Sequence, residues 1–189
     1  MKSLIIIGLL TSSAAALAAN RVLLETPITY APGASVVEKV KQECQIENML
    51  ETRVGKAFGN LNKGGDSTIS TGAQATDDAA VVRLRITHVL GVGGGAWSGP
   101  KAITIDADLI EKNKVVRHTK INRWTTGGAF GGFKGTCSIL ERSAAAIGKD
   151  LARWVRDPAF TVPDEPQPAG QVGDSTSAPS PADKASSGR

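Results

Sequence analysis

The chain has 189 residues, of which 41% are hydrophobic and 21% charged, and its formal net charge is +4. This length suits one domain with a hydrophobic core. This net charge is modest, and the sequence lacks the clusters of lysine and arginine that are typical of nucleic-acid-binding proteins. We therefore expect no nucleic-acid partner. Two cysteines are too few for a structural zinc site without histidines at ligand-like spacing, so we also expect no metal or cofactor.

Residues 1–18 have the three parts of a cleavable signal peptide. Lys2 supplies the charge, Leu4–Leu10 begin an apolar run, and Ala16-Leu17-Ala18 place small residues before a cleavage site at Ala19. The strongly apolar part is shorter than the roughly 20 residues of a membrane-spanning helix. We therefore predict export to the periplasm, or alternatively secretion, with no stable membrane insertion after cleavage.

The N-terminal part of the mature chain predicts one amphipathic helix. Residues 34–42 fit a short edge strand or an early helical turn. After Cys44, apolar residues recur at three- and four-residue spacing until Gly59 and residues 60–65 end the pattern. The apolar positions of this helix are Ile46, Met49, Leu50, Val54, Ala57 and Phe58.

The middle of the chain predicts antiparallel strands. Residues 82–90 and 102–111 alternate apolar and polar positions, and Lys112-Asn113 form a tight turn into 114–124. A weak strand is expected around 68–70. The outward arginines and aspartates of neighbouring strands can pair across the sheet, and these are Arg83, Arg85, Asp106 and Asp108.

The second helix is predicted after Cys137. Ser138 and Glu141 have the spacing of a capping box, and Asp157-Pro158 end the helix. Its apolar face comprises Leu140, Ala144, Ile147, Leu151, Trp154 and Val155. The element order predicts an α+β fold, in which an antiparallel sheet meander carries two amphipathic helices on one face.

The C-terminal segment predicts disorder. Pro163–Arg189 hold five of the nine prolines together with many small residues, and such a segment cannot bury enough apolar surface to offset its ordering entropy. We therefore divide the chain into a signal peptide, residues 1–18, a single α+β domain, residues 19–158, and a disordered Pro/Ser/Ala-rich tail, residues 159–189.

Two glycine-rich segments flank the predicted hairpin. Gly91–Ala96 fit the G-x-G-x-x-A spacing of dinucleotide sites, but a strand follows instead of the required helix, which favours a hairpin loop. Gly127–Thr136 precede a helix, and Lys134 with free N–H groups there could hold an anion. The Gly-Lys-Thr order of a phosphate-binding loop is absent, so a non-catalytic loop is favoured.

Aromatic residues in and beside these segments are the best candidates for a binding surface. They are Trp97, Trp124, Phe130 and Phe133, and Lys134 lies next to Phe133 in the sequence. Aromatic side chains among glycines can form an adaptable contact surface, or can fold back over the core.

Candidates for catalysis are few. His88 lies on a predicted apolar strand face, which favours a buried structural role, and no carboxylate close in sequence orients His118. Asp106 and Asp108 share a strand face and could form an acid/base pair, although pairing with arginines explains them more simply. We assign no catalytic residue and expect that the chain is not an enzyme.

The even cysteine count of an exported chain predicts one disulfide, Cys44–Cys137, joining the N-terminal ends of the two helices.

Glu43-Cys44-Gln45-Ile46, and Gly132–Ser138 with Glu141-Arg142, resemble a group of uncharacterised exported bacterial proteins in which a Gly-rich segment precedes a "GTCS…ER" helix. The helix–meander–helix order is more distantly similar to envelope lipoproteins that activate penicillin-binding proteins and to the curli-secretion lipoprotein. This distant resemblance implies a non-enzymatic envelope role.

These observations predict a non-catalytic periplasmic or secreted protein that binds another envelope protein or a cell-wall polymer such as peptidoglycan through its Gly/aromatic loops. The alternative is a periplasmic hydrolase or anion-binding enzyme that uses Asp106, Asp108 or His118 near the Lys134 loop. A purely structural secreted factor is a third possibility.

Overall fold

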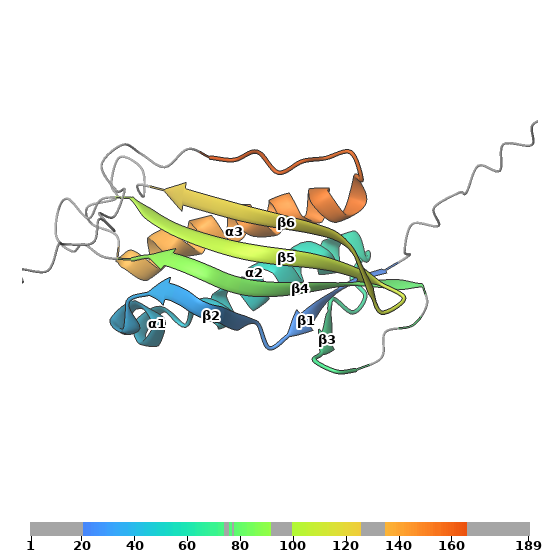
Figure 1. Ribbon diagram of the computed structural model, residues 1–189, viewed down its shortest axis with the longest axis horizontal. Helices are drawn as coiled ribbons and strands as arrows, with labels where there is room; N and C mark the ends of the chain where they lie inside the picture. The colour runs from blue at the N-terminus through green and yellow to red at the C-terminus, as the bar shows by residue number, and fades with distance from the viewer. Residues whose placement is uncertain (1–20, 74–75, 77, 92–99, 126–134, 166–189) are drawn as a thin grey trace, which may run out of the picture.

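The computed structural model describes residues 21–73, 76, 78–91, 100–125 and 135–165. These residues form an α+β fold with one open, mixed sheet and three helices (Figure 1). The elements in chain order are β1 Arg21–Thr26, β2 Thr29–Val36, α1 Glu38–Cys44, α2 Ile46–Leu61, β3 Thr68–Ser70, β4 Ala79–Leu90, β5 Lys101–Glu111, β6 Lys114–Thr125 and α3 Thr136–Arg156. The predicted fold class is confirmed.

The sheet has the strand order β3-β1-β4-β5-β6, and β2 also pairs with β4. Strands β4, β5 and β6 form the predicted antiparallel meander. Strands β1 and β2 instead run parallel to β4, β1 beside its first residues and β2 beside its last. The sheet as a whole is therefore mixed, because both N-terminal strands extend the predicted meander at the edge of β4 that β5 leaves free.

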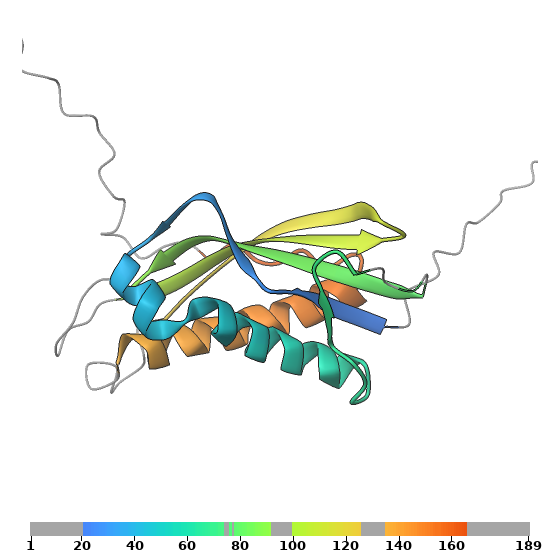
Figure 2. The same cartoon turned by 90° about the horizontal axis from the view of Figure 1, so that it is seen from below.

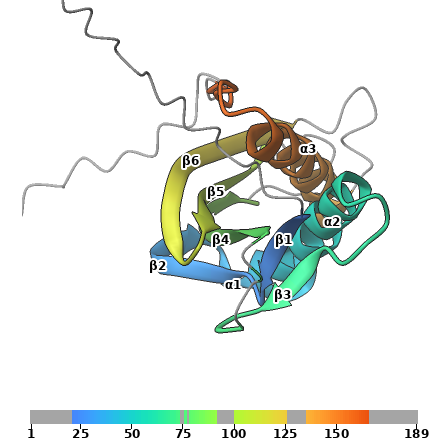
Figure 3. The ribbon, with the colours of Figure 1, turned by 90° about the vertical axis from the view of Figure 1, so that its right-hand side faces the viewer.

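Helices α2 and α3 lie side by side on one face of this sheet (Figures 2 and 3). Their predicted apolar faces are confirmed: Leu50 and Phe58 of α2 and Leu140 and Ile147 of α3 are fully buried. The helices approach closely at Gly148, where an added Cβ would lie 2.9 Å from the carbonyl oxygen of Arg53. Burial of these faces is the main favourable contribution to folding. No helix among the described residues has the length and apolarity to cross a membrane.

A β-bulge in β4 changes the face on which His88 lies. The pairing register shifts between Ile86, which is opposite Ile105, and His88, which is opposite Thr104. Since a one-residue insertion reverses the alternation, His88 lies on the face away from the helices and is half-buried. The expectation that His88 belongs to the apolar face is wrong for this reason.

The start of α3 also differs from the prediction. The helix begins at Thr136 after Gly135, and no side chain caps its first turn. Ser138 donates its hydroxyl to the Gly135 carbonyl at 2.8 Å, while Glu141 forms an ion pair with Arg53 of α2. The predicted capping box is absent because Ser138 lies inside the helix, and Glu141 links the two helices instead.

Residues 157–165 run from the end of α3 along β6 (Figure 1). Val162 is buried and Phe160 packs against the core. Arg117 donates to the carbonyl of Phe160 at 3.2 Å, and Arg123 to that of Pro163 at 3.0 Å. The packed part of the chain therefore extends past Pro158.

Candidate functional site

The two glycine-rich segments leave the sheet from neighbouring positions. Leu90 near the end of β4 is paired with Ala102 of β5, and Ala102 is paired with Trp124 of β6. Segments 92–99 and 126–134 follow β4 and β6 at this end, which we name the loop-bearing end. Of the predicted binding residues, Trp124 is described here, and Trp97, Phe130, Phe133 and Lys134 lie outside the described residues.

Leu90, Ala102 and Trp124 form an apolar row on the face of the sheet away from α2 and α3. The indole N–H of Trp124 is buried and has no hydrogen-bond partner among the described residues. A buried indole N–H normally has an acceptor, because leaving it unpaired costs about 1–3 kcal/mol. Within the described part of the chain, the base of the loop-bearing end therefore has a buried donor without a partner on the ring of Trp124.

Lys101 lies at the same end but on the helix side of the sheet, since its neighbours of equal parity, Ile103 and Ile105, are core residues. The side chain is fully buried. Burial lowers the pKa of its ammonium group, because the charged form loses hydration. Lys101 supports the base of this end from within and is not part of its surface.

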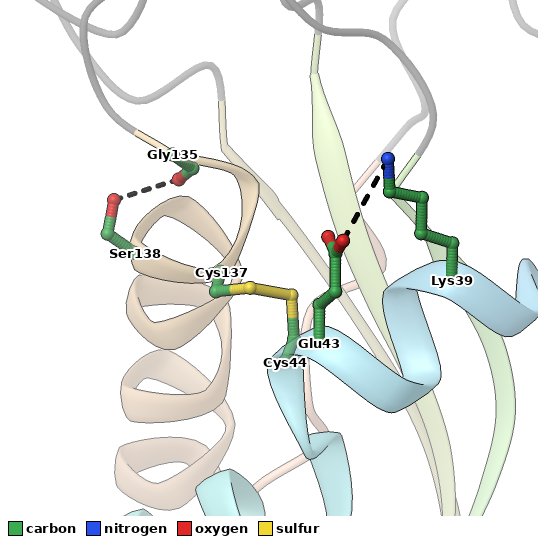
Figure 4. Close-up of a disulfide and its surroundings, with 6 residues drawn as sticks. All are labelled: Lys39, Glu43, Cys44, Gly135, Cys137 and Ser138. Atoms are coloured by element: carbon green, nitrogen blue, oxygen red, sulfur yellow. Dashed lines mark hydrogen bonds and ion pairs between the residues drawn. A yellow bond between two sulfur atoms is a disulfide. The ribbon is translucent and has the colours of Figure 1, made fainter.

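The predicted disulfide is present between Cys44 and Cys137, with a Cα–Cα distance of 5.0 Å (Figure 4). Its place in the fold differs from the expectation in one respect. Gln45 has a left-handed backbone, φ 46°, which separates α1 from α2 and makes Cys44 the last residue of α1. The bond therefore joins the end of α1, rather than the start of a helix, to the first turn of α3.

Helix α1 is fixed to the loop-bearing end by two contacts. The disulfide holds its last residue beside α3, just after segment 126–134. Its Val40 packs against Gly91, where an added Cβ would lie 2.6 Å from a Val40 methyl group. A larger residue at position 91 would push α1 away from the sheet, so this glycine is required for the close approach.

The structure also brings together residues that the sequence leaves apart. The Nδ1 atom of His118 lies 2.7 Å from Asp108, and Arg85 donates to the other oxygen of Asp108 at 2.9 Å. Asp108 is buried beneath both partners. The expected pairing between outward arginines and aspartates is confirmed for Arg85 and Asp108, whereas Arg83 binds Glu25 of β1.

Sequence reasoning missed the His118–Asp108 contact because it depends on a second bulge. Counting back from the pair Glu111 and Lys114 would place Asp108 opposite Arg117. The register shifts by one residue between Leu109 and Ile110, which places His118 opposite Asp108. Only the tight turn, and not this bulge, is visible in the sequence pattern.

This polar cluster lies far from the loop-bearing end. His118 precedes Thr125, the last residue of β6, by seven positions, which is about 23 Å at a strand's rise of about 3.3 Å per residue. Asp106 lies opposite Lys120 on the same face. No group of acidic, histidine or cysteine side chains among the described residues has the arrangement of a metal site. The cluster is thus a set of cross-strand polar contacts remote from the end of β6, where segment 126–134 begins.

No protein-family model matches this sequence, and no curated protein is similar to it. Among solved structures, the chain is similar to PelC from Paraburkholderia phytofirmans, described as a dodecamer, with 15% identity and a TM-score of 0.44 over 74% of this chain and 93% of PelC. It is also similar to a Xanthomonas campestris protein of the DUF330 family, with 15% identity and a TM-score of 0.44 over 71% of this chain and 82% of that protein. The resemblance carried by the "GTCS…ER" motif stays a prediction, and the function proposed below rests on this chain's own residues.

Proposed function

We propose that this chain is an exported envelope protein without catalytic activity, which binds another envelope protein or a cell-wall polymer at its loop-bearing end. The observation that carries the proposal is the buried indole N–H of Trp124 at the base of that end, which has no hydrogen-bond partner among the residues that the structure describes. A partner whose binding exposes this N–H and supplies a carbonyl or hydroxyl oxygen would satisfy the donor.

Two further features support the proposal. The first glycine-rich segment joins β4 to β5 and the second follows β6, which pairs with β5, so the aromatic residues predicted for binding belong to segments that start at the same end of the sheet. The disulfide fixes the start of α3, which follows the second of these segments. A rigid base lowers the entropy that a loop loses when it binds, and therefore favours recognition there.

The geometry of the described residues supports binding better than the enzyme alternative. General acid/base chemistry needs its groups within hydrogen-bond reach of one substrate position. Asp108 is already bonded to Arg85 and His118, on the sheet face and far from the roots of the loops. These residues act as an electrostatic connection between strands β4, β5 and β6.

The test is capture of partners from envelope extract by the periplasmic protein. We compare the wild type with Trp124→Phe, which keeps the aromatic ring but removes the N–H, and with a Trp97→Ala/Phe130→Ala/Phe133→Ala variant. The matched control is Val115→Ala/Val116→Ala, which removes exposed apolar surface at the opposite end of β6. Partners lost with both loop-end variants and kept by the control support the proposal; equal capture by all four proteins would overturn it.

Export itself is tested by intact mass. We expect protein from the periplasm to begin at or near Ala19. A mass that retains residues 1–18 would contradict export by cleavage.

A further inference from the structure

A pocket of about 480 Å³ lies between the bend that joins β1 to β2, the helix α1 and the beginning of α2. Pro27 and Ile28 of the bend supply its apolar part. Its volume is within the range of about 300–1,000 Å³ that is typical of ligand sites. Three segments therefore converge on a cavity that the proposed function does not use.

Two carboxylates of α2 are held in fixed positions at this pocket. Glu51 accepts a hydrogen bond from the backbone N–H of Ile28 at 2.8 Å, and Glu47 accepts one from the hydroxyl of Tyr30 at 3.1 Å. Each bond uses one carboxylate oxygen and thereby sets the direction of the other. Both side chains are half-buried, so their interactions are less screened than those of exposed charges.

The pocket is locally negative in a chain whose net charge is +4. Its lining has three carboxylates, from Glu38, Glu47 and Glu51, and a single cation, Lys41. The ammonium group of Lys41 lies over the ring of Tyr30, 4.6 Å from its centroid. A pocket with a net negative charge attracts positively charged ligands.

Tyr30 keeps its proton over the working pH range. Burial first, and the nearby Glu47 second, raise the pKa of its phenol well above the ordinary value, because both disfavour the phenolate. The hydroxyl therefore continues to donate to Glu47, whose charge stays fixed toward the pocket.

We propose that this pocket binds the ammonium or guanidinium group of a lysine or arginine side chain from a partner polypeptide. An organic cation fits better than a metal ion, because the three carboxylates of the pocket do not lie close enough together to form a metal site, and no such site is found among the described residues. The side-chain amides of Gln42, Gln45 and Asn48 also line the pocket and offer donors and acceptors to a peptide backbone. The lining of this pocket includes neither Trp124 nor Gly91, although its helix α1 also contacts the loop-bearing end.

The experiment is a calorimetric titration of the exported chain with the peptide acetyl-Gly-Lys-Gly-amide. We expect saturable binding, and none when the lysine is replaced by its neutral Nε-acetyl form. Glu47→Gln and Glu51→Gln should each weaken binding about three- to tenfold, between the effects of an exposed ion pair and of a buried charged hydrogen bond. Both substitutions keep the oxygen that accepts the structural hydrogen bond, so the fold should persist.

The matched control is Glu111→Gln, which removes the same charge at the distant β5–β6 turn and should leave binding unchanged. Glu38→Gln, on the exposed first turn of α1, is a second pocket variant should either α2 variant prove unstable in a melting curve. Equal weakening by Glu111→Gln, equal affinity for the acetylated peptide, or no saturable binding by the wild type would overturn the proposal. Trp124→Phe should not change the titration, which separates this site from the proposed function.

Discussion

Removing the Cys44–Cys137 disulfide should greatly destabilise the domain. The bond joins residues 93 positions apart, so the reduced unfolded chain gains the freedom of a long loop. The chain-entropy model gives about 4–5 kcal/mol for a loop of this length, as an upper figure. For a domain of this size, that loss corresponds to a fall in Tm of roughly 10–20 °C.

The variant for this test is Cys44→Ala/Cys137→Ala, because Cys44 is buried and alanine introduces no unpaired hydroxyl there. Urea unfolding of variant and wild type gives the free energy of unfolding and its dependence on urea. We expect a lower free energy in the variant and a larger urea dependence, since its unfolded state exposes more surface.

Wild-type protein in a thiol reductant is the matched control. It should approach the variant in stability, while the variant itself should not respond to the reductant. If mass spectrometry finds the Cys44 and Cys137 peptides linked in the wild type and the variant nevertheless loses less than about 1 kcal/mol, the entropic reasoning is refuted.

Three further predictions concern packing, ionisation and the C-terminal segment. Gly148→Ala should lower the free energy of unfolding by about 1–3 kcal/mol, because the added Cβ would lie 2.9 Å from a backbone oxygen of α2. The control Gly55→Ala, whose Cβ would lie 3.7 Å from its nearest neighbour, should not destabilise the domain, and urea unfolding of both variants tests this. Tyr30 is the single tyrosine, so tyrosinate absorbance should rise near pH 10 in unfolded protein but at clearly higher pH in native protein. The stability linked to the raised pKa of Tyr30 is therefore lost as the pH rises above 10, and coincident titrations of native and unfolded protein would contradict this. Deleting residues 166–189, which keeps the contacts of Arg123 with Pro163 and Glu165, should change Tm by only a few degrees. Deleting Phe160–Arg189 should cost about 2–4 kcal/mol through loss of buried Val162, and similar melting curves for the two truncations would contradict the packing described.

The local pattern of the sequence determined which segments form the main elements and which faces they bury. The three- and four-residue spacing from Ile46 and from Leu140 fixed the inner faces of α2 and α3, and the alternation in β4 and β5 fixed most of the meander. These predictions succeeded because helix and strand periods depend only on residues close in the chain.

The candidate site could be predicted only in part from the sequence. The segments with glycines and aromatics flanking the hairpin could be recognised, and an even cysteine count indicated the disulfide. That the indole N–H of Trp124 is buried with no partner among the described residues, and that α1 packs on Gly91, depends on contacts between elements distant in the chain.

The tertiary structure decided the pairing partners and the register. Both N-terminal strands lie parallel to β4, a choice that depends on which sheet edge is free after the meander forms. Two bulges moved His88 to the outer face and placed His118 opposite Asp108. A bulge adds one residue without changing the composition of the strand, so the sequence pattern does not contain it, yet it reverses which side chains face the core and which meet across the sheet.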